Sequence, residues 1–289
     1  MRIFGLDFTS APGKRKPITC VACTLNGTIL QVQDYLAIPT FAAFEAFLQT
    51  PGPWLAAFDF PFGQPRKLIT NLHWPETWAD YIQLVAAMDK TTFEATLTSY
   101  RQSRPMGDKQ HLRATDKLAG ACSPMMLYRV PVGKMFFQGV PRLLAAGVSV
   151  LPCHPTRDSR IVVEGYPSLV ARTWLGKRSY KSDERGKQTP AQEDARRTLL
   201  GGLCSRELLE IYGCTLSIPA SMATAFVQEP MGDALDALLC ALQAAWSYAQ
   251  RDHGYGIPAW CDKDEGWIVD PGMVGGAMTT VTTITPTRS

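Results

Sequence analysis

The chain has 289 residues, of which 46% are hydrophobic and 19% are charged, enough to bury a substantial core without disulfide or metal staples. Its formal net charge of +3 permits a polyanionic partner but does not by itself indicate one. The sequence has eight cysteines and no secretory pattern at the start. No apolar run approaches the roughly 20 residues of a spanning helix. We therefore expect a cytoplasmic protein with free thiols and no membrane contact.

Two apolar runs of strand length, one at the start and one some fifty positions later, each end on a single carboxylate. The first ends at Asp7 and the second at Asp59, and turn signals with Pro and Gly follow both. Because burying an unpaired carboxylate is costly, acids in such places are candidate functional groups. If the two strands are neighbours, both carboxylates lie at one edge of a sheet, where open α/β folds place their sites.

The segment between these acids predicts a hairpin and a helix. Residues 18–25 and 29–36 read as strands joined at Asn26-Gly27, a strong hairpin dipeptide, so the chain opens with a three-strand meander. An amphipathic helix over 40–49 follows, capped by Thr40. The near-continuous apolar run that leads to Asp59 suits a strand covered on both faces.

From about residue 64 to 155 the pattern is helical, with helices expected at 76–90, 92–102 and 133–146. Residues 101–117 are rich in Lys and Arg and are broken by a Pro-Met-Gly turn. We therefore expect this basic segment to be a solvated surface rather than a binding strip.

The second half of the chain alternates strands and helices. A short strand is expected at 148–151, and a better one over 160–164 ends on Glu164, a third acid at a strand end. Helices are expected at 168–175, 189–203 and 205–212, and a loop with a short final strand at 260–271. The stretch 172–187 is basic and contains a loop broken by Gly176 and Gly186, inside which Tyr180 is the one aromatic that could stack on a base.

The most hydrophobic helix of the chain is expected at 232–246, apolar nearly all round and therefore buried against the sheet. Asp233 and Asp236 share one face of its first turn, at the positive end of the helix dipole. Asp233 alone is as well explained as the N-cap. Asp236 is harder to explain as a cap, because Leu235 and Ala237 flank it.

Several carboxylates at one site cannot all be ionised without a counter-charge. A divalent cation supplies that charge, and oxygen ligands without His or thiolate select Mg²⁺ or Mn²⁺. The acids thus predict metal-dependent phosphodiester hydrolysis, with basic loops on the nucleic-acid backbone. The expected metal ligands are Asp7, Asp59, Asp236 and Glu164, with Asp233 as a fourth catalytic aspartate that binds metal or orients the base. For Glu164, a place behind the ligands or a purely structural role is an open alternative.

Together these motifs resemble a known family. The motifs that show the resemblance are Gly5-Leu6-Asp7-Phe8-Thr9, Ala57-Phe58-Asp59-Phe60-Pro61-Phe62-Gly63, Arg113-Ala114-Thr115-Asp116, Ser123-Pro124, Glu164-Gly165-Tyr166-Pro167, Tyr180-Lys181-Ser182-Asp183 and Gly232-Asp233-Ala234-Leu235-Asp236-Ala237. From residue 1 to about 250 the chain is similar to the predicted RNase H-like nuclease family known as domain-of-unknown-function family 429. Within these motifs, Thr9, Arg113 and Lys181 are the candidate substrate contacts.

The resemblance implies an α/β fold: an RNase H-like mixed sheet, with an antiparallel three-strand meander plus parallel strands, helices on both faces and a mostly helical insertion. It is expected to divide into a core at 1–63 and 148–275, the insertion at 64–147 and a C-terminal tail at 276–289. The acids follow a layout similar to that of Holliday-junction resolvases, with one on the first strand, one on the fourth and a pair on the final helix.

Two other hypotheses remain open at this point. Actin-like sugar kinases also open with a strand whose Asp precedes a Thr/Ser turn, as Asp7 does here. The second, glycine-rich phosphate loop of those kinases has no counterpart in this sequence. A non-catalytic module that binds nucleic acid or a partner would keep the acids as relics or caps. ATP hydrolysis stimulated by a small alcohol would favour the kinase hypothesis, and failure to bind Mn²⁺ would favour the non-catalytic module.

Overall fold

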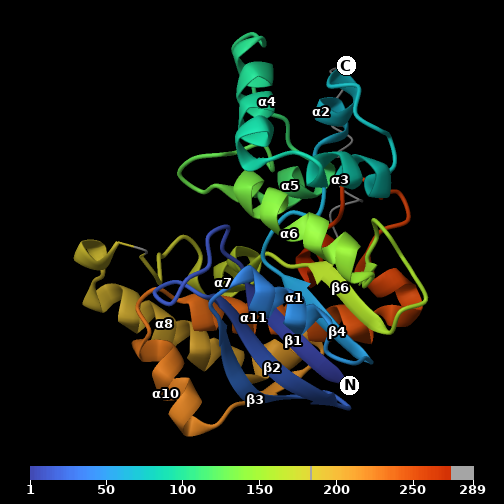
Figure 1. Cartoon of the computed structure of the whole chain (residues 1–289). Helices are drawn as coiled ribbons and strands as arrows, with labels where there is room; N and C mark the ends of the chain where they lie inside the picture. The colour runs from blue at the N-terminus through green and yellow to red at the C-terminus, as the bar shows by residue number, and fades with distance from the viewer. Residues whose placement is uncertain (183, 275–289) are drawn as a thin grey trace, which may run out of the picture.

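The computed structural model describes residues 1–182 and 184–274. These residues contain one mixed sheet of seven strands in the order β5-β6-β4-β1-β2-β3-β7 (Figure 1). The strands are β1 (Arg2–Asp7), β2 (Ile18–Asn26), β3 (Ile29–Ile38), β4 (Trp54–Phe58), β5 (Ser149–Val150), β6 (Arg160–Glu164) and β7 (Thr215–Ser217). β1, β2 and β3 form an antiparallel meander, while β4 runs parallel to β1 and β6 parallel to β4. The predicted mixed α/β fold is therefore confirmed.

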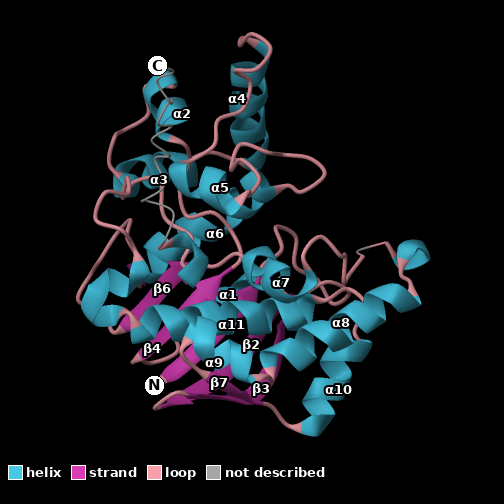
Figure 2. Ribbon diagram, turned by 180° about the vertical axis from the view of Figure 1, so that it is seen from behind, coloured by secondary structure: helices cyan, strands magenta, loops and turns pink. Residues whose placement is uncertain are grey.

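Helices cover both faces of the sheet (Figures 1 and 2). They are α1 (Phe41–Leu48), α2 (Arg66–Asn71), α3 (Trp78–Ala86), α4 (Lys90–Gln102), α5 (Ala114–Ala119), α6 (Val132–Ala146), α7 (Pro167–Leu175), α8 (Pro190–Leu203), α9 (Arg206–Tyr212), α10 (Ala220–Gln228) and α11 (Asp233–Ala249). The core of one face includes side chains of α7 to α11, and that of the other includes α1, α3 and α6. The helices α2 to α6 gather at one end of the molecule (Figure 1). Of the helices in these ranges, none is long and apolar enough to cross a membrane.

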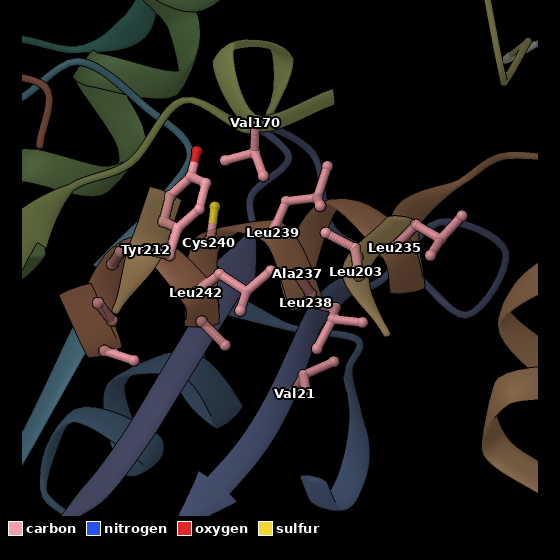
Figure 3. Packing of buried hydrophobic residues seen from close by; sticks show 14 of the residues in the cluster. Val21, Val170, Leu203, Tyr212, Leu235, Ala237, Leu238, Leu239, Cys240 and Leu242 are labelled. Carbon is pink, nitrogen blue, oxygen red and sulfur yellow. The ribbon is translucent and has the colours of Figure 1, made fainter. Parts of the chain in front are cut away.

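The helix α11 is the centre of its face. It packs across β1, β2 and β4, and Figure 3 shows Leu238 and Leu242 among the side chains that fill this core with Val21 of β2. The contact with β1 depends on Gly5, because a Cβ there would lie 2.0 Å from the Ala237 carbonyl oxygen and 2.1 Å from the Ala241 nitrogen. A glycine two residues before Asp7 thus lets the helix lie directly on the strand.

Some sequence expectations were wrong. The segment 101–117 is not simply a solvated surface, since Arg113 and Asp116 in it are 1% and 0% exposed. No final strand forms at 260–271, where an isolated bridge pairs Ile268 with Glu164. The short elements α2, α5, α10 and β7 were not predicted. The tail at 276–289 lies outside the described residues.

Candidate carboxylate site

Strand alternation places Asp7 and Asp59 on the same face of the sheet. Along β1, Ile3 belongs to the core under α11, while Phe4 and Leu6 belong to the opposite core, so Asp7 follows Ile3 and Gly5 on the α11 side. Along β4 the residues of the α11 core are Leu55 and Ala57, and Asp59 continues that series.

The two aspartates are also held at the same edge of the sheet. β1 and β4 pair in parallel register, and beyond the last pair the Asp59 N–H donates a 3.0 Å hydrogen bond to the Leu6 carbonyl. Two carboxylates from adjacent strands therefore leave the sheet side by side, as the sequence predicted.

The first turn of α11 brings two more acids to this edge. Gly232, with φ 75°, is the N-cap and Asp233 is the first helical residue, so the explanation of Asp233 as the cap is wrong. Asp236 is 1% exposed and lies one turn further along. Because α11 rests directly on β1 at Gly5, its first turn is beside the end of that strand.

These acids disturb one another electrostatically. Burial, together with the charges of Asp236, Asp233 and Asp59, raises the pKa of Asp7 well above its usual value, with Lys181 opposing the rise. Burial and then the charge of Asp236 raise the pKa of Asp59 to about 7. Burial raises the pKa of Asp233 to about 6, against the opposing charge of Lys16. Asp7, Asp59 and Asp233 each resist ionisation, the mark of a carboxylate cluster with too little positive charge.

Lys181 is in direct contact with the cluster. Its ammonium donates to Asp236 Oδ2, and the hydroxyl of Tyr180 donates to Asp236 Oδ1. The hydroxyl of Tyr180 is therefore engaged and its side chain is buried, while stacking of its ring on a base stays a prediction. Within residues 1–182 and 184–274, the carboxylates of Asp7 and Asp59 have no hydrogen-bond or ion-pair partner.

Glu164 lies on the other side of the sheet from Asp7 and Asp59, which favours its structural role over that of a metal ligand, although its charge contributes to the raised pKa of Asp59. It pairs in register with Phe58, one residue before Asp59, and so faces the opposite side of the sheet. There Arg113 donates to both of its oxygens at 2.6 and 2.8 Å, and the Phe62 N–H donates to Oε2 at 2.9 Å. Glu164 therefore anchors the turn that follows Asp59.

The expected substrate contacts have different outcomes. Arg113 is closed off between Glu164 and Asp116, with Nη2 2.7 Å from Asp116 Oδ1, which corrects its assignment as a substrate contact. Thr9 lies two residues beyond Asp7 at the same edge and is half-buried, and its hydroxyl accepts a 3.4 Å hydrogen bond from Ala11. Lys181 lies at the cluster but is engaged with Asp236.

The donor set suits a hard divalent cation, because it consists of carboxylate oxygens without His or thiolate. As the side chains stand, however, no three Asp, Glu, His or Cys residues in the described part of the chain are grouped so as to hold a metal ion. Lys181 occupies the side of Asp236 that such an ion would need. The residues therefore fit the cation in chemistry, provided that Lys181 leaves Asp236.

The pairing of Lys181 with Asp236 and the role of Gly5 were missed at the level of sequence. Lys181 and Asp236 are 55 residues apart, and no local pattern joins them. Gly5 did carry a signal, because it lies two residues before Asp7 and hence on the same face of the strand.

Fold and site together define an α/β protein with a cluster of aspartates at one edge of a mixed sheet, beside the first turn of a buried helix. A family profile described as "Protein of unknown function (DUF429)" matches residues 5–259. The chain belongs to this family. No curated protein and no solved structure matches the chain.

Proposed function

We propose that this protein is a divalent-metal-dependent nuclease, with Mg²⁺ or Mn²⁺ held by Asp7, Asp59 and Asp236. The observation that carries the proposal is the convergence of these carboxylates on one side of the sheet, where Lys181 binds Asp236 and the pKa values of Asp7 and Asp59 stay raised despite the charge of Lys181. A bound divalent cation would relieve the repulsion that contributes to these two raised pKa values.

When bound there, such a cation supplies an activated water and neutralises charge on a phosphodiester. The protein's own groups have distinct parts. Asp233, whose pKa is raised to about 6, accepts a proton near neutral pH. Lys181, once released from Asp236, contacts a phosphate oxygen of the substrate. The turn that carries Asp59 is held in place from the far face by Glu164.

The proposal extends to the compartment. All eight cysteines are free, and Cys20, Cys23, Cys214 and Cys240 are buried. Free thiols in this number are usual in a reducing environment, so we propose that the protein acts in the cytoplasm.

A cleavage assay tests the proposed function. Labelled DNA and RNA are incubated with the protein in Mn²⁺, in Mg²⁺ and in EDTA. We expect cleavage that depends on the metal, is lost in Asp7→Asn, and is kept in the control Asp252→Asn, whose side chain is 77% exposed. Full activity of Asp7→Asn would contradict the assignment, and alcohol-stimulated ATP hydrolysis without cleavage would favour a phosphotransferase.

A further inference from the structure

A pocket of about 580 Å³ lies between α7 and the loop that follows it. The helix lines it with residues that share one face by their spacing of three and four, and the loop closes the other side. The helical residues are Ser168, Ala171, Arg172 and Leu175, and the loop contributes residues 176–181. Neither the fold nor the proposed chemistry accounts for this pocket.

Its lining joins an apolar floor to a basic rim. Ala171, Leu175 and Tyr180 are buried and form the apolar part. Four cations complete the lining, and none of the lining residues in the described ranges is acidic: Arg172, Lys177, Arg178 and Lys181. An apolar surface bordered by Lys and Arg suits a base or sugar with phosphates on either side.

The pocket connects to the carboxylate site at two points. Tyr180 and Lys181 line the pocket and both bind Asp236. On the other side, Arg172 donates a 3.0 Å hydrogen bond from Nη2 to the Tyr166 hydroxyl. Burial raises the pKa of Tyr166, the charge of Arg172 opposes the rise, and the negative charge of Asp59 adds a smaller contribution to it.

Arg172 is also fixed from behind. Its Nη1 donates a 2.7 Å hydrogen bond to the Ala119 carbonyl, and its guanidinium lies 5.4 Å from the centre of the Tyr166 ring. Lys177 and Arg178 are exposed, as Arg172 is, but they belong to the loop and not to α7. One wall of the pocket is thus held rigid beside the aspartates, while its outer cations are free to reach a ligand.

We propose that this pocket binds a nucleotide of the nucleic-acid substrate, next to the phosphodiester that lies at the carboxylates. The inference rests on the proposed function and deepens it. The apolar floor takes the base or sugar, and Lys177 and Arg178 take the outer phosphate. Lys181 takes the phosphate nearest Asp236, and Arg172 holds the inner wall.

Binding measured without metal separates this inference from the proposed function. The probe is a fluorescein-labelled single-stranded oligonucleotide of about 16 nucleotides, in DNA and RNA forms, followed by fluorescence anisotropy in EDTA over a range of salt concentrations. The double variant Lys177→Ala/Arg178→Ala removes two exposed cations of the pocket. Lys187→Ala is the matched control, since its side chain is on the same loop, 69% exposed and outside the pocket.

We expect the wild-type chain to bind, and the double variant to lose about tenfold in affinity and about 0.7 from the salt slope, the value for one phosphate contact. Lys187→Ala should bind as the wild type does. Equal binding by all three proteins, or no binding by the wild type, would overturn the proposal that this pocket binds a nucleotide. If pocket-dependent binding occurs without any Mn²⁺-dependent cleavage, the pocket is supported and the nuclease proposal is overturned.

Discussion

Replacing Asp59 by Asn should stabilise the metal-free protein at alkaline pH. The folded protein raises the pKa of Asp59 from an ordinary value of 3.8 to about 7, so the carboxylate is easier to ionise in the unfolded chain. The native state therefore loses stability as pH rises from about 4 to about 7, and the loss is complete above that range. Below about pH 4 both states are protonated and the effect vanishes.

The magnitude follows from that interval. Each pKa unit is worth about 1.4 kcal/mol, so the rise from 3.8 to about 7 sets a ceiling of about 4 kcal/mol. Because Asp59 is only half-buried, solvent screening reduces this to about 1–3 kcal/mol. In a chain of this length that corresponds to a Tm about 2–5 °C higher for Asp59→Asn than for the wild type at pH 8.

Thermal and urea denaturation at pH 8 and pH 4.5, in EDTA and in Mn²⁺, measure this difference. We expect the gain at pH 8 in EDTA to shrink at pH 4.5 and to reverse in Mn²⁺, because metal stabilises only a chain that binds it. The control Asp252→Asn changes an exposed acid and should leave all four values unaltered. If Asp59→Asn lowered stability at pH 8 in EDTA, the repulsion argument would fail.

Three further variants test the packing and the charges. Gly5→Ala should cost about 3 kcal/mol or more of unfolding free energy and abolish metal binding, since the added methyl group meets the backbone of α11. Urea denaturation measures this cost, and Gly13→Ala is the control, because the space around Gly13 is open. Glu164→Gln should lower the free energy of unfolding by about 3–5 kcal/mol, because it weakens the buried pair with Arg113. Calorimetry should find the Mn²⁺ affinity of the folded protein unchanged, and a lost affinity would show that Glu164 is a metal ligand. Lys181→Ala should tighten Mn²⁺ binding about tenfold, or about 1.4 kcal/mol, because its ammonium no longer competes for the site; weaker binding would refute the competition.

The predicted meander and the placement of Asp7 and Asp59 came from local signals. The alternation of apolar and polar residues, the Asn26-Gly27 turn and the acids at strand ends can each be recognised within a few consecutive residues. The structure places β1 and β4 side by side. The helix α11 was predictable for the same reason, since its apolar surface extends nearly all round.

Glu164 and Arg113 were misplaced because their surroundings depend on register and on distant partners. A strand-end acid on β6 resembles one on β4, but an offset of one residue turns Glu164 to the other face. Arg113 lies in a basic stretch that reads as solvated, and its partner Glu164 is 51 residues away. Pairings of this kind are fixed by tertiary packing and leave no pattern in a single sequence.

The central claim is that Asp7, Asp59 and Asp236 together hold a hard divalent cation. Its most direct measurement is anomalous diffraction from a crystal soaked in Mn²⁺ at a concentration that supports cleavage. We predict an anomalous peak bounded by these three carboxylates, with the Lys181 ammonium displaced from Asp236. A crystal with no peak there, and with Lys181 still bound to Asp236, would contradict it.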